Sequence, residues 1–374
     1  MTQAALAQDP RLSDSMTDDL CARVRAVVKS ELAPLADAID KGECYPADVL
    51  RKLGAAGAWE THIPHRGDAD LRPAIAAMSA VAECCGATAF MAWCQDTLAW
   101  YVGNSENAAL TSRLLKPVAS GTQLGGTGLS NPMKSFFGIE ALKLRGRRVE
   151  GGFVVRGGLP WVSNLGPDHI FGTIFEREDA PGEKVMFLAD CANENILLRH
   201  CPPFLAMDGT GTYAVHFRDA FVPDEMVLAD AAMPFVKKIR SGFILLQAGM
   251  ALGLIRDSIA TMASLRPALG HINCFLDQQP EDLEVALADC EAEALALAAT
   301  PYDQSAAYWE RVIAIRLRLG ELSVAAAHAA MLHCGARGYL KSHRAQRRLR
   351  EAYFVAIVTP ATKQLKKMLI DQGM

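Results

Sequence analysis

Three blocks of different hydrophobic periodicity follow one another along the chain, and their order limits the folds open to it. Apolar residues recur at three- and four-residue spacing up to about residue 118, which predicts helices. From about residue 119, glycines become frequent and short β-rich runs replace the long periodic stretches. Helical spacing returns at about residue 229. We therefore expect a helical domain over residues 1–118, a β domain over residues 119–228 and a helical domain over residues 229–374.

Local patterns refine this expectation for the second and third blocks. The middle block holds short runs rich in β-formers, spaced as in a sandwich or barrel, of which four examples are residues 152–156, 169–175, 184–188 and 212–217. The last block holds four long helical spans, with a loop over residues 267–280, at residues 235–265, 280–299, 304–334 and 344–370. The expected fold class is α+β multidomain: an N-terminal α-helical domain, a central β-barrel or sandwich domain and a C-terminal four-helix bundle.

Composition and charge argue against several classes of function. The formal net charge is −4, and the densest basic run, residues 341–350, lies inside a helical pattern, so we expect no nucleic-acid partner. The ten cysteines form no CxxC pair and no zinc-like spacing with histidine, so no metal site is expected. Residues 1–19 are polar, and the longest apolar stretch, residues 243–255, is shorter than the roughly 18 residues of a membrane span. We expect a cytoplasmic protein with no membrane partner.

Four segments share the order and spacing of motifs known from one protein family. Residues 158–164 read GLPWVSN and contain Trp161 and Ser163, and residues 212–228 read TYAVHFRDAFVPDEMVL. Arg266 opens RPALG after a long helical span, and CGARGY at residues 334–339 contains Gly335 and Gly338. Together they resemble the segments GxKxWITN, TxxVxFxDVxVPxxxVL, RxxFG and LGGxGY of the acyl-CoA dehydrogenase superfamily. The resemblance therefore spans most of the β block and the last helical block.

The resemblance implies that the chain binds FAD. Trp161 would pack against the flat flavin ring, as an indole can on an aromatic surface. Ser163 would hydrogen-bond near the flavin N5. Thr127, in the segment GGTGLSNP at residues 125–132, would contact the pyrimidine side of the ring. The phosphate and adenosine end of FAD would be held from a neighbouring subunit, which implies a homotetramer or homodimer, by Arg266, Gly335 and Gly338.

One position departs from the family where chemistry depends on it. The family carries a catalytic glutamate nine residues after the arginine of its RDA motif. Here that motif reads REA from Arg350, and the ninth residue is Thr359, followed by Pro360. A threonine hydroxyl is not a base near neutral pH. The second base position known in the family falls near Arg240, where no acidic residue stands. The sequence leaves the catalytic residue unknown.

Three functions remain open at this point. The first, which we expect, is an FAD-dependent oxidoreductase that acts on an acyl-CoA or a related thioester, uses a base elsewhere in the chain and passes electrons to an electron-transferring flavoprotein. The second is a flavin-dependent monooxygenase or oxidase on the same fold, which needs no α-proton base. The third is a non-catalytic member of the family that binds flavin or another ligand. Retention of Trp161 and Ser163 favours the first two over the third.

Overall fold

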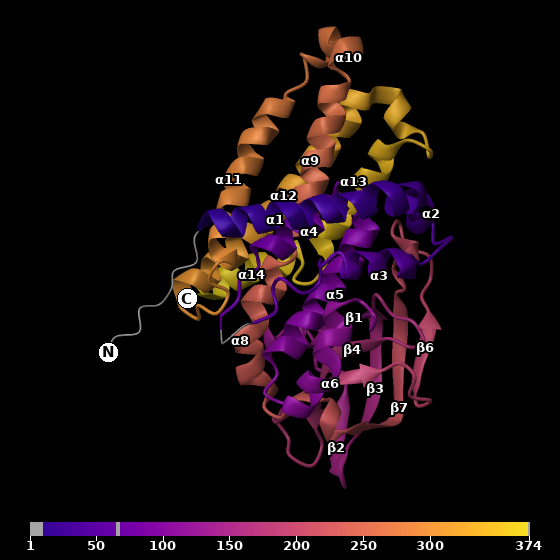
Figure 1. The fold of residues 1–374 in the computed structure, drawn as a ribbon, viewed down its shortest axis with the longest axis vertical. Helices are drawn as coiled ribbons and strands as arrows, with labels where there is room; N and C mark the ends of the chain where they lie inside the picture. The colour runs from indigo at the N-terminus through magenta and orange to yellow at the C-terminus, as the bar shows by residue number, and fades with distance from the viewer. Residues whose placement is uncertain (1–9, 65–67, 373–374) are drawn as a thin grey trace.

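The N-terminal region of the protein is helical. The computed structural model describes residues 10–64 and 68–372. Its first helices pack around α5, which is buried over nearly its whole length because small and aromatic side chains cover all its faces. The elements, which appear in Figure 1, are α1 (Pro10–Val27), η1 (Val28–Leu32), η2 (Ala33–Leu35), α2 (Ala36–Asp40), α3 (Ala47–Ala55), α4 (Arg72–Ala82), α5 (Gly86–Asn104) and α6 (Ala108–Ala119).

The central region is a single hydrogen-bonded sheet, eight-stranded within the described residues. The strand order is β6-β7-β3-β2-β4-β5-β8, and β1 pairs parallel to β4. Each of the four predicted runs is a strand, extended by up to several residues. The elements are β1 (Gly125–Thr127), α7 (Ser130–Phe136), β2 (Arg145–Val149), β3 (Gly152–Val162), β4 (Ile170–Arg177), β5 (Lys184–Asp190), β6 (Ile196–His200), η3 (Asp208–Thr210), β7 (Tyr213–Pro223), η4 (Asp224–Met226) and β8 (Val227–Ala229).

The last block is a helical bundle, but its long predicted spans are divided. The first breaks at Leu246–Gln247, and the last is interrupted near Pro360, which cannot continue a helix interior. The predicted loop over residues 267–280 was wrong for its first half, which is helical. The elements are α8 (Ala232–Leu245), α9 (Ala248–Ser264), α10 (Arg266–Asn273), α11 (Pro280–Ala298), α12 (Ala306–Cys334), η5 (Gly335–Tyr339), α13 (Arg344–Ile357) and α14 (Thr362–Gln372).

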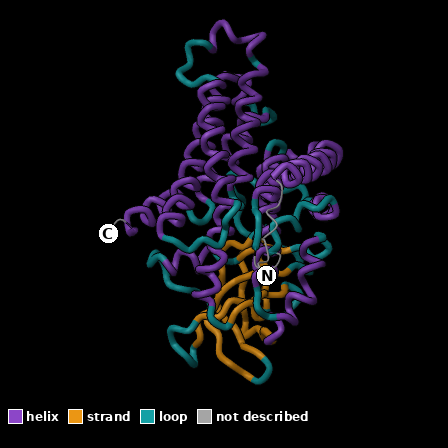
Figure 2. The backbone as a smooth tube through the Cα atoms, turned by 60° about the vertical axis from the view of Figure 1, so that its left-hand side comes forward, coloured by secondary structure: helices purple, strands orange, loops and turns teal. Residues whose placement is uncertain are grey.

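The bundle and the sheet lie at opposite ends of the molecule. Figure 2 shows the helices of the bundle extending away from the strands, with the N-terminal helices beside both. Residues Ala232–Ser264 form a stretch long and apolar enough to cross a membrane by length and composition. Because 89% of its most apolar window is buried inside the protein, this stretch packs as a core element of the bundle.

A buried ionic cluster connects α13 with α5 of the N-terminal region and with α9 of the bundle. The Glu351 carboxylate is fully buried and accepts hydrogen bonds from Arg348 Nη1 (2.7 Å), Arg347 Nη1 (3.2 Å) and the backbone N–H of Gly86 (3.1 Å). Arg348 also donates from Nε to Asp257 on α9, at 2.7 Å. A Cβ atom at residue 86 would lie 2.8 Å from the Glu351 Cδ, so this close approach requires a glycine. The cluster thereby joins α5, α9 and α13.

A second buried pair, His62 and Asp96, has too few partners for its polar atoms. His62 Nε2 lies 2.7 Å from the backbone oxygen of Asp96, to which it donates, so Nδ1 is left as an acceptor. The Asp96 Oδ1 lies 3.6 Å from that Nδ1, and neither atom has a hydrogen bond within the described residues. Burial lowers the pKa of His62 to about 4 and raises the pKa of Asp96 well above its ordinary range. The folded pair therefore keeps its proton on Asp96.

This proton placement predicts how stability depends on pH. Between about pH 4 and 6.5 the pair holds one proton in each state, on Asp96 in the folded protein and on His62 in the unfolded protein. Unfolding then neither binds nor releases a proton at this pair, so the pair does not change the free energy of unfolding with pH in this range. Above pH 6.5 the unfolded histidine loses its proton while folded Asp96 keeps it, so stability falls by up to about 1.4 kcal/mol per pH unit. We expect Asp96→Asn to remove this decline, as measured by urea unfolding at pH 6 and pH 8.

The matched control is Asp48→Asn, because the Asp48 side chain is 92% exposed. It should leave the pH dependence of the wild-type protein intact. An equal decline above pH 6.5 in Asp96→Asn and in the wild type would mean that Asp96 is ionised in the folded state, contrary to this assignment.

Candidate functional site

Strand β1 places Thr127 against helix α5. At Gly125 a Cβ atom would lie 1.8 Å from the backbone oxygen of Ile170, so only glycine permits the pairing of β1 with β4. The Thr127 Oγ1 lies 2.8 Å from the Tyr101 hydroxyl and accepts from the backbone N–H of Leu129 at 3.3 Å. Burial raises the pKa of Tyr101 far above its ordinary value, so its hydroxyl keeps its proton. Thr127 is the one hydrogen-bond partner of this buried hydroxyl within the described residues, so Tyr101 uses its proton to donate to Thr127. The hydroxyl proton of Thr127 is then left to bond a ligand.

Ser163 ends a chain of hydroxyl groups whose direction is fixed. Thr210 donates to the backbone oxygen of Met207 at 2.9 Å, so the Thr212 hydroxyl, 2.8 Å from Thr210, must donate to it. The Ser163 Oγ, 2.7 Å from the Thr212 Oγ1, therefore donates to Thr212. Because a hydroxyl has one proton, Ser163 presents acceptor lone pairs, and not its hydroxyl proton, to the site.

Trp161 lines a small cavity. Its side chain is 57% exposed, which is unusual for an indole and leaves a flat apolar surface available. The cavity has a volume of about 10 Å³, room for about one water molecule. Gly126, on the strand that carries Thr127, approaches the Ser163 backbone so closely that a Cβ would lie 2.3 Å from the Ser163 oxygen. The cavity is lined by Gly128, Ser130, Asn131, Lys134, Glu140, Leu159, Pro160 and Trp161.

Thr359 lies in the turn between α13 and α14 and contacts a residue that lines this cavity. Its Oγ1 is 2.9 Å from the Oγ of Ser130, a residue that also lines the cavity. Its backbone oxygen accepts a hydrogen bond of 3.0 Å from Gln247 Nε2, at the break between α8 and α9. The Thr359–Pro360 peptide bond is cis. The sheet side and the bundle thus meet at Thr359 through hydroxyl and amide groups.

Arg316 on α12 supports the same turn from inside the bundle. Its Nε donates to Gln247 Oε1 at 2.6 Å, and its Nη2 donates to the backbone oxygen of Val355 near the C-terminus of α13, at 2.5 Å. The side chain is buried, and burial lowers its pKa to about 10, so it stays charged at neutral pH. Within the described part of the chain, Arg316 forms no ion pair with a carboxylate. A buried positive charge without a countercharge therefore lies behind Thr359.

The remaining predicted residues lie elsewhere, at the far end of the bundle. Figure 1 places α10, which begins at Arg266, at the opposite end of the molecule from the strands. Arg266 forms an exposed ion pair with Glu281. Asn273, at the end of α10, donates to the backbone oxygen of His333 just before Gly335, so α10 and η5 are neighbours. Within one chain the structure does not bring Arg266, Gly335 and Gly338 to the group around Trp161.

Sequence reasoning missed five residues of the site: Ser130, Asn131, Glu140, Gln247 and Arg316. Ser130 and Asn131 lie in the segment GGTGLSNP, of which only Thr127 matched the family. Motif matching had no pattern for Glu140, Gln247 and Arg316, which lie in the loop after α7, at a helix break and in the middle of α12. The signal in the sequence was the polar character of Gln247 within an otherwise apolar helical span. Among the residues that the structure describes, no group of three or more His, Cys, Asp or Glu side chains is placed to hold a metal ion.

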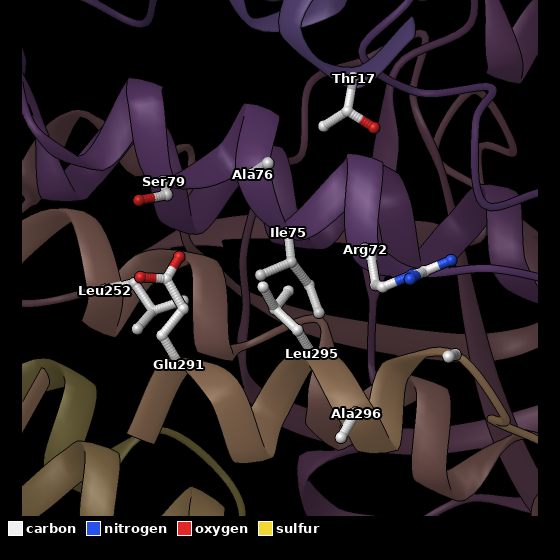
Figure 3. A pocket seen from close by; sticks show the side chains of 10 residues that line it. Thr17, Arg72, Ile75, Ala76, Ser79, Leu252, Glu291, Leu295 and Ala296 are labelled. Carbon is white, nitrogen blue, oxygen red and sulfur yellow. The ribbon is translucent and has the colours of Figure 1, made fainter. Parts of the chain in front are cut away.

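A larger cavity, of about 280 Å³, lies between α4, α9, α11 and the helix α1, and contains none of the predicted residues. Figure 3 shows Ile75 and Leu295 facing one another near its centre, with Leu252, Glu291 and Ser79 on one side. The charged residues that line it already form ion pairs, Glu291 with Arg256 and Arg72 with Asp70. This cavity is separate from the site around Trp161.

Comparisons with known proteins agree on one family. The family described as acyl-CoA dehydrogenase, N-terminal domain, matches residues 16–122. A probable acyl-CoA dehydrogenase of Bacillus subtilis, YngJ, is 23% identical over 93% of this chain and 94% of its own. The solved structure of butyryl-CoA dehydrogenase from Megasphaera elsdenii has a TM-score of 0.84 at 14% identity and covers 99% of both chains. The FAD complex of PigA has a TM-score of 0.80 at 12% identity, covering 100% of this chain and 99% of that one.

Proposed function

This chain belongs to the acyl-CoA dehydrogenase superfamily, and from that premise we propose that it is an FAD-dependent oxidoreductase acting on an acyl-CoA or a related thioester. One observation supports the proposal above others. Trp161, near the end of β3, borders a cavity that Ser130 also lines, and Ser130 contacts the Thr359 hydroxyl. Gly126, next to Thr127 on β1, approaches the backbone of Ser163. A flat ring with polar edges matches this arrangement of an exposed indole flanked by hydroxyl groups.

The residues present fit a flavin. Bound FAD supplies the acceptor for a hydride from the substrate. Trp161 offers the apolar surface for the ring, and Thr127 has a hydroxyl proton for a carbonyl at its edge. Ser163 offers an acceptor, which matches the N–H that a flavin carries at N5 only when reduced. The chain's own contribution is thus to bind the ring and to favour its reduced form.

The direction of the hydroxyl chain predicts an effect on the flavin midpoint potential. Thr212→Val removes the group to which Ser163 donates, so the Ser163 proton can turn toward the flavin and the acceptor for the reduced form is lost. A neutral hydrogen bond contributes about 0.5–1.5 kcal/mol, so we expect the two-electron potential to fall by about 10–30 mV. The measurement is a redox titration of the flavin spectrum against a dye of known potential.

Thr122→Val is the control, because Thr122 lies on an exposed turn and, among the residues described, bonds only Pro117 and Ser120. Its potential should equal that of the wild type. A rise in potential in Thr212→Val would show that Ser163 donates to the flavin in the wild-type protein, the reverse of the proposed direction.

The exposed tip of the bundle supports assembly with further copies of the chain. Apolar side chains cluster there around Arg266, with Phe275 80% and Tyr339 86% exposed. We include in the proposal a homotetramer or homodimer, in which this tip of one chain brings Arg266, Gly335 and Gly338 to the phosphate and adenosine end of FAD in another. An electron-transferring flavoprotein is the proposed electron acceptor, and the cytoplasm the proposed location.

The test is the visible spectrum of the purified protein, recorded anaerobically before and after addition of butyryl-CoA and palmitoyl-CoA. We expect a bound-flavin band that bleaches with at least one of them. Protein supplied with FAD that retains none would contradict the proposal.

A second candidate is supported by the hydroxyl pair at Thr359. Because Ser130 and Thr359 present no carboxylate, an oxygen-using flavin reaction, which needs no α-proton base, also fits the site. In that case the flavin band would persist with acyl-CoA. The flavin, once reduced chemically, would be reoxidised rapidly by oxygen.

A further inference from the structure

A carboxylate that motif matching did not find lies at the cavity beside Trp161. Glu140, in the loop between α7 and β2, lines this cavity together with Ser130. Ser130 contacts the Thr359 hydroxyl at 2.9 Å, so the cavity adjoins the position at which the family keeps its base. Glu140 is the only acidic residue among those lining the cavity in the described part of the chain.

Glu140 is held in place by a buried side chain. Asn131 is 3% exposed, and its Nδ2 donates both to Glu140 Oε1 and to the backbone oxygen of Ala141, each at 2.9 Å. Its Oδ1 accepts from the backbone N–H of Lys143, at 2.9 Å. The hydrogen bonds that this amide makes within the described residues therefore all fix residues 140–143. A buried amide used in this way orients the carboxylate before any ligand arrives.

One oxygen of Glu140 remains available for a proton. Oε1 accepts the bond from Asn131, whereas Oε2 accepts no hydrogen bond within the described residues. Two ammonium groups lie near the carboxylate, Lys134 at 3.8 Å and Lys143 at 3.9 Å, and both are beyond hydrogen-bond distance. They balance the negative charge without occupying Oε2.

We propose that Glu140 is the proton acceptor of the reaction and replaces the carboxylate that is absent at residue 359. This inference rests on the proposed function. The Cα–H bond of the thioester breaks and its proton passes to Glu140 Oε2. The electron pair of that bond forms the Cα=Cβ double bond as the hydride on Cβ passes to the bound FAD. The substrate is oxidised by two electrons and the FAD is reduced by two. Removal of the proton acceptor should slow the reaction about 10²–10⁴-fold.

The test separates proton removal from hydride transfer. Holoenzyme is first reduced with dithionite, so that no hydride can be accepted, and is then incubated with butyryl-CoA in D₂O. Deuterium entering the α-position is followed by NMR. We expect Glu140→Gln to slow this exchange about 10²–10⁴-fold. Its FAD content and its spectral change on binding butyryl-CoA should match those of the wild type.

Glu178→Gln is the matched control, because Glu178 pairs with Arg156 and lines no part of the cavity. It should exchange at the wild-type rate. Glu140→Asp covers the case in which Glu140→Gln fails to fold. It keeps the charge but withdraws the carboxylate by one methylene, which should slow exchange about 10²-fold.

Two results would overturn the inference in distinguishable ways. If wild-type holoenzyme bleaches with butyryl-CoA and Glu140→Gln, or a folded Glu140→Asp, exchanges at the wild-type rate, only the role of Glu140 is wrong. If wild-type protein with FAD neither bleaches nor exchanges with butyryl-CoA or palmitoyl-CoA, the proposed function fails and the role of Glu140 fails with it.

Discussion

Thr359→Glu, made in protein that already carries Glu140→Gln, should raise the rate of flavin reduction by butyryl-CoA about 10²–10⁴-fold. The turn that carries Thr359 is already supported by Gln247, and the Ser130 hydroxyl is in hydrogen-bond contact with the residue's side chain. The charge of Arg316 behind the turn favours an ionised carboxylate there. Anaerobic stopped-flow absorbance measures the rate. In the wild-type background the gain should be smaller, because Glu140 already accepts the proton.

Thr359→Gln in the same background is the control for size. It nearly matches the shape of glutamate but has no base, so it should give no gain. An equal gain with glutamine would assign the effect to packing. No gain with glutamate, while butyryl-CoA still perturbs the flavin spectrum, would show that substrate and residue 359 are out of alignment.

The largest effect on stability should come from Glu351→Ala. This change leaves the buried guanidinium groups of Arg347 and Arg348 without the carboxylate between them, and leaves the Gly86 N–H without its acceptor. Breaking one side of a buried ionic cluster costs about 3–5 kcal/mol in the free energy of unfolding. Urea unfolding followed by circular dichroism would measure it.

Glu178→Ala provides the comparison for an exposed ion pair. Its partner Arg156 has a side chain that is 63% exposed, so the change should leave the free energy of unfolding nearly unchanged. Equal losses for the two variants would mean that the cluster around Glu351 is hydrated, and that its burial does not govern its contribution.

Much of the fold could be predicted from periodicity. The order of helical region, sheet and bundle follows from where the spacing of apolar residues changes, and the four predicted runs are strands β3, β4, β5 and β7. Strands β1, β2, β6 and β8 were not predicted, because they are short and their pairing depends on distant partners. Helix α10 was missed because Pro267 and Gly270 resemble loop residues. The proline instead occupies the second helical position, where its missing N–H is tolerated.

Only those residues of the site that belong to recognised motifs could be predicted from the sequence. Thr127, Trp161 and Ser163 were named from their motifs, and the structure places Gly126, the neighbour of Thr127, against the backbone of Ser163. Their roles as donor or acceptor depend on Tyr101, Thr212 and Thr210, which the motifs do not include. Glu140 could not be assigned from sequence because its orientation comes from Asn131, nine residues earlier, across a turn that no periodicity describes. Contacts between segments decide these details.

The cluster around Glu351 also bears on how the chain matures during synthesis. The N–H of Gly86, at the start of α5, finds its acceptor 265 residues later in the sequence. At translation speeds of about 5–20 residues per second, that carboxylate leaves the ribosome roughly 13–53 s after its glycine. Until then the N-terminal helices expose the surface that α13 will cover. We therefore expect nascent chains stalled before residue 351 to bind chaperones and to be cleaved by protease more readily than completed chains.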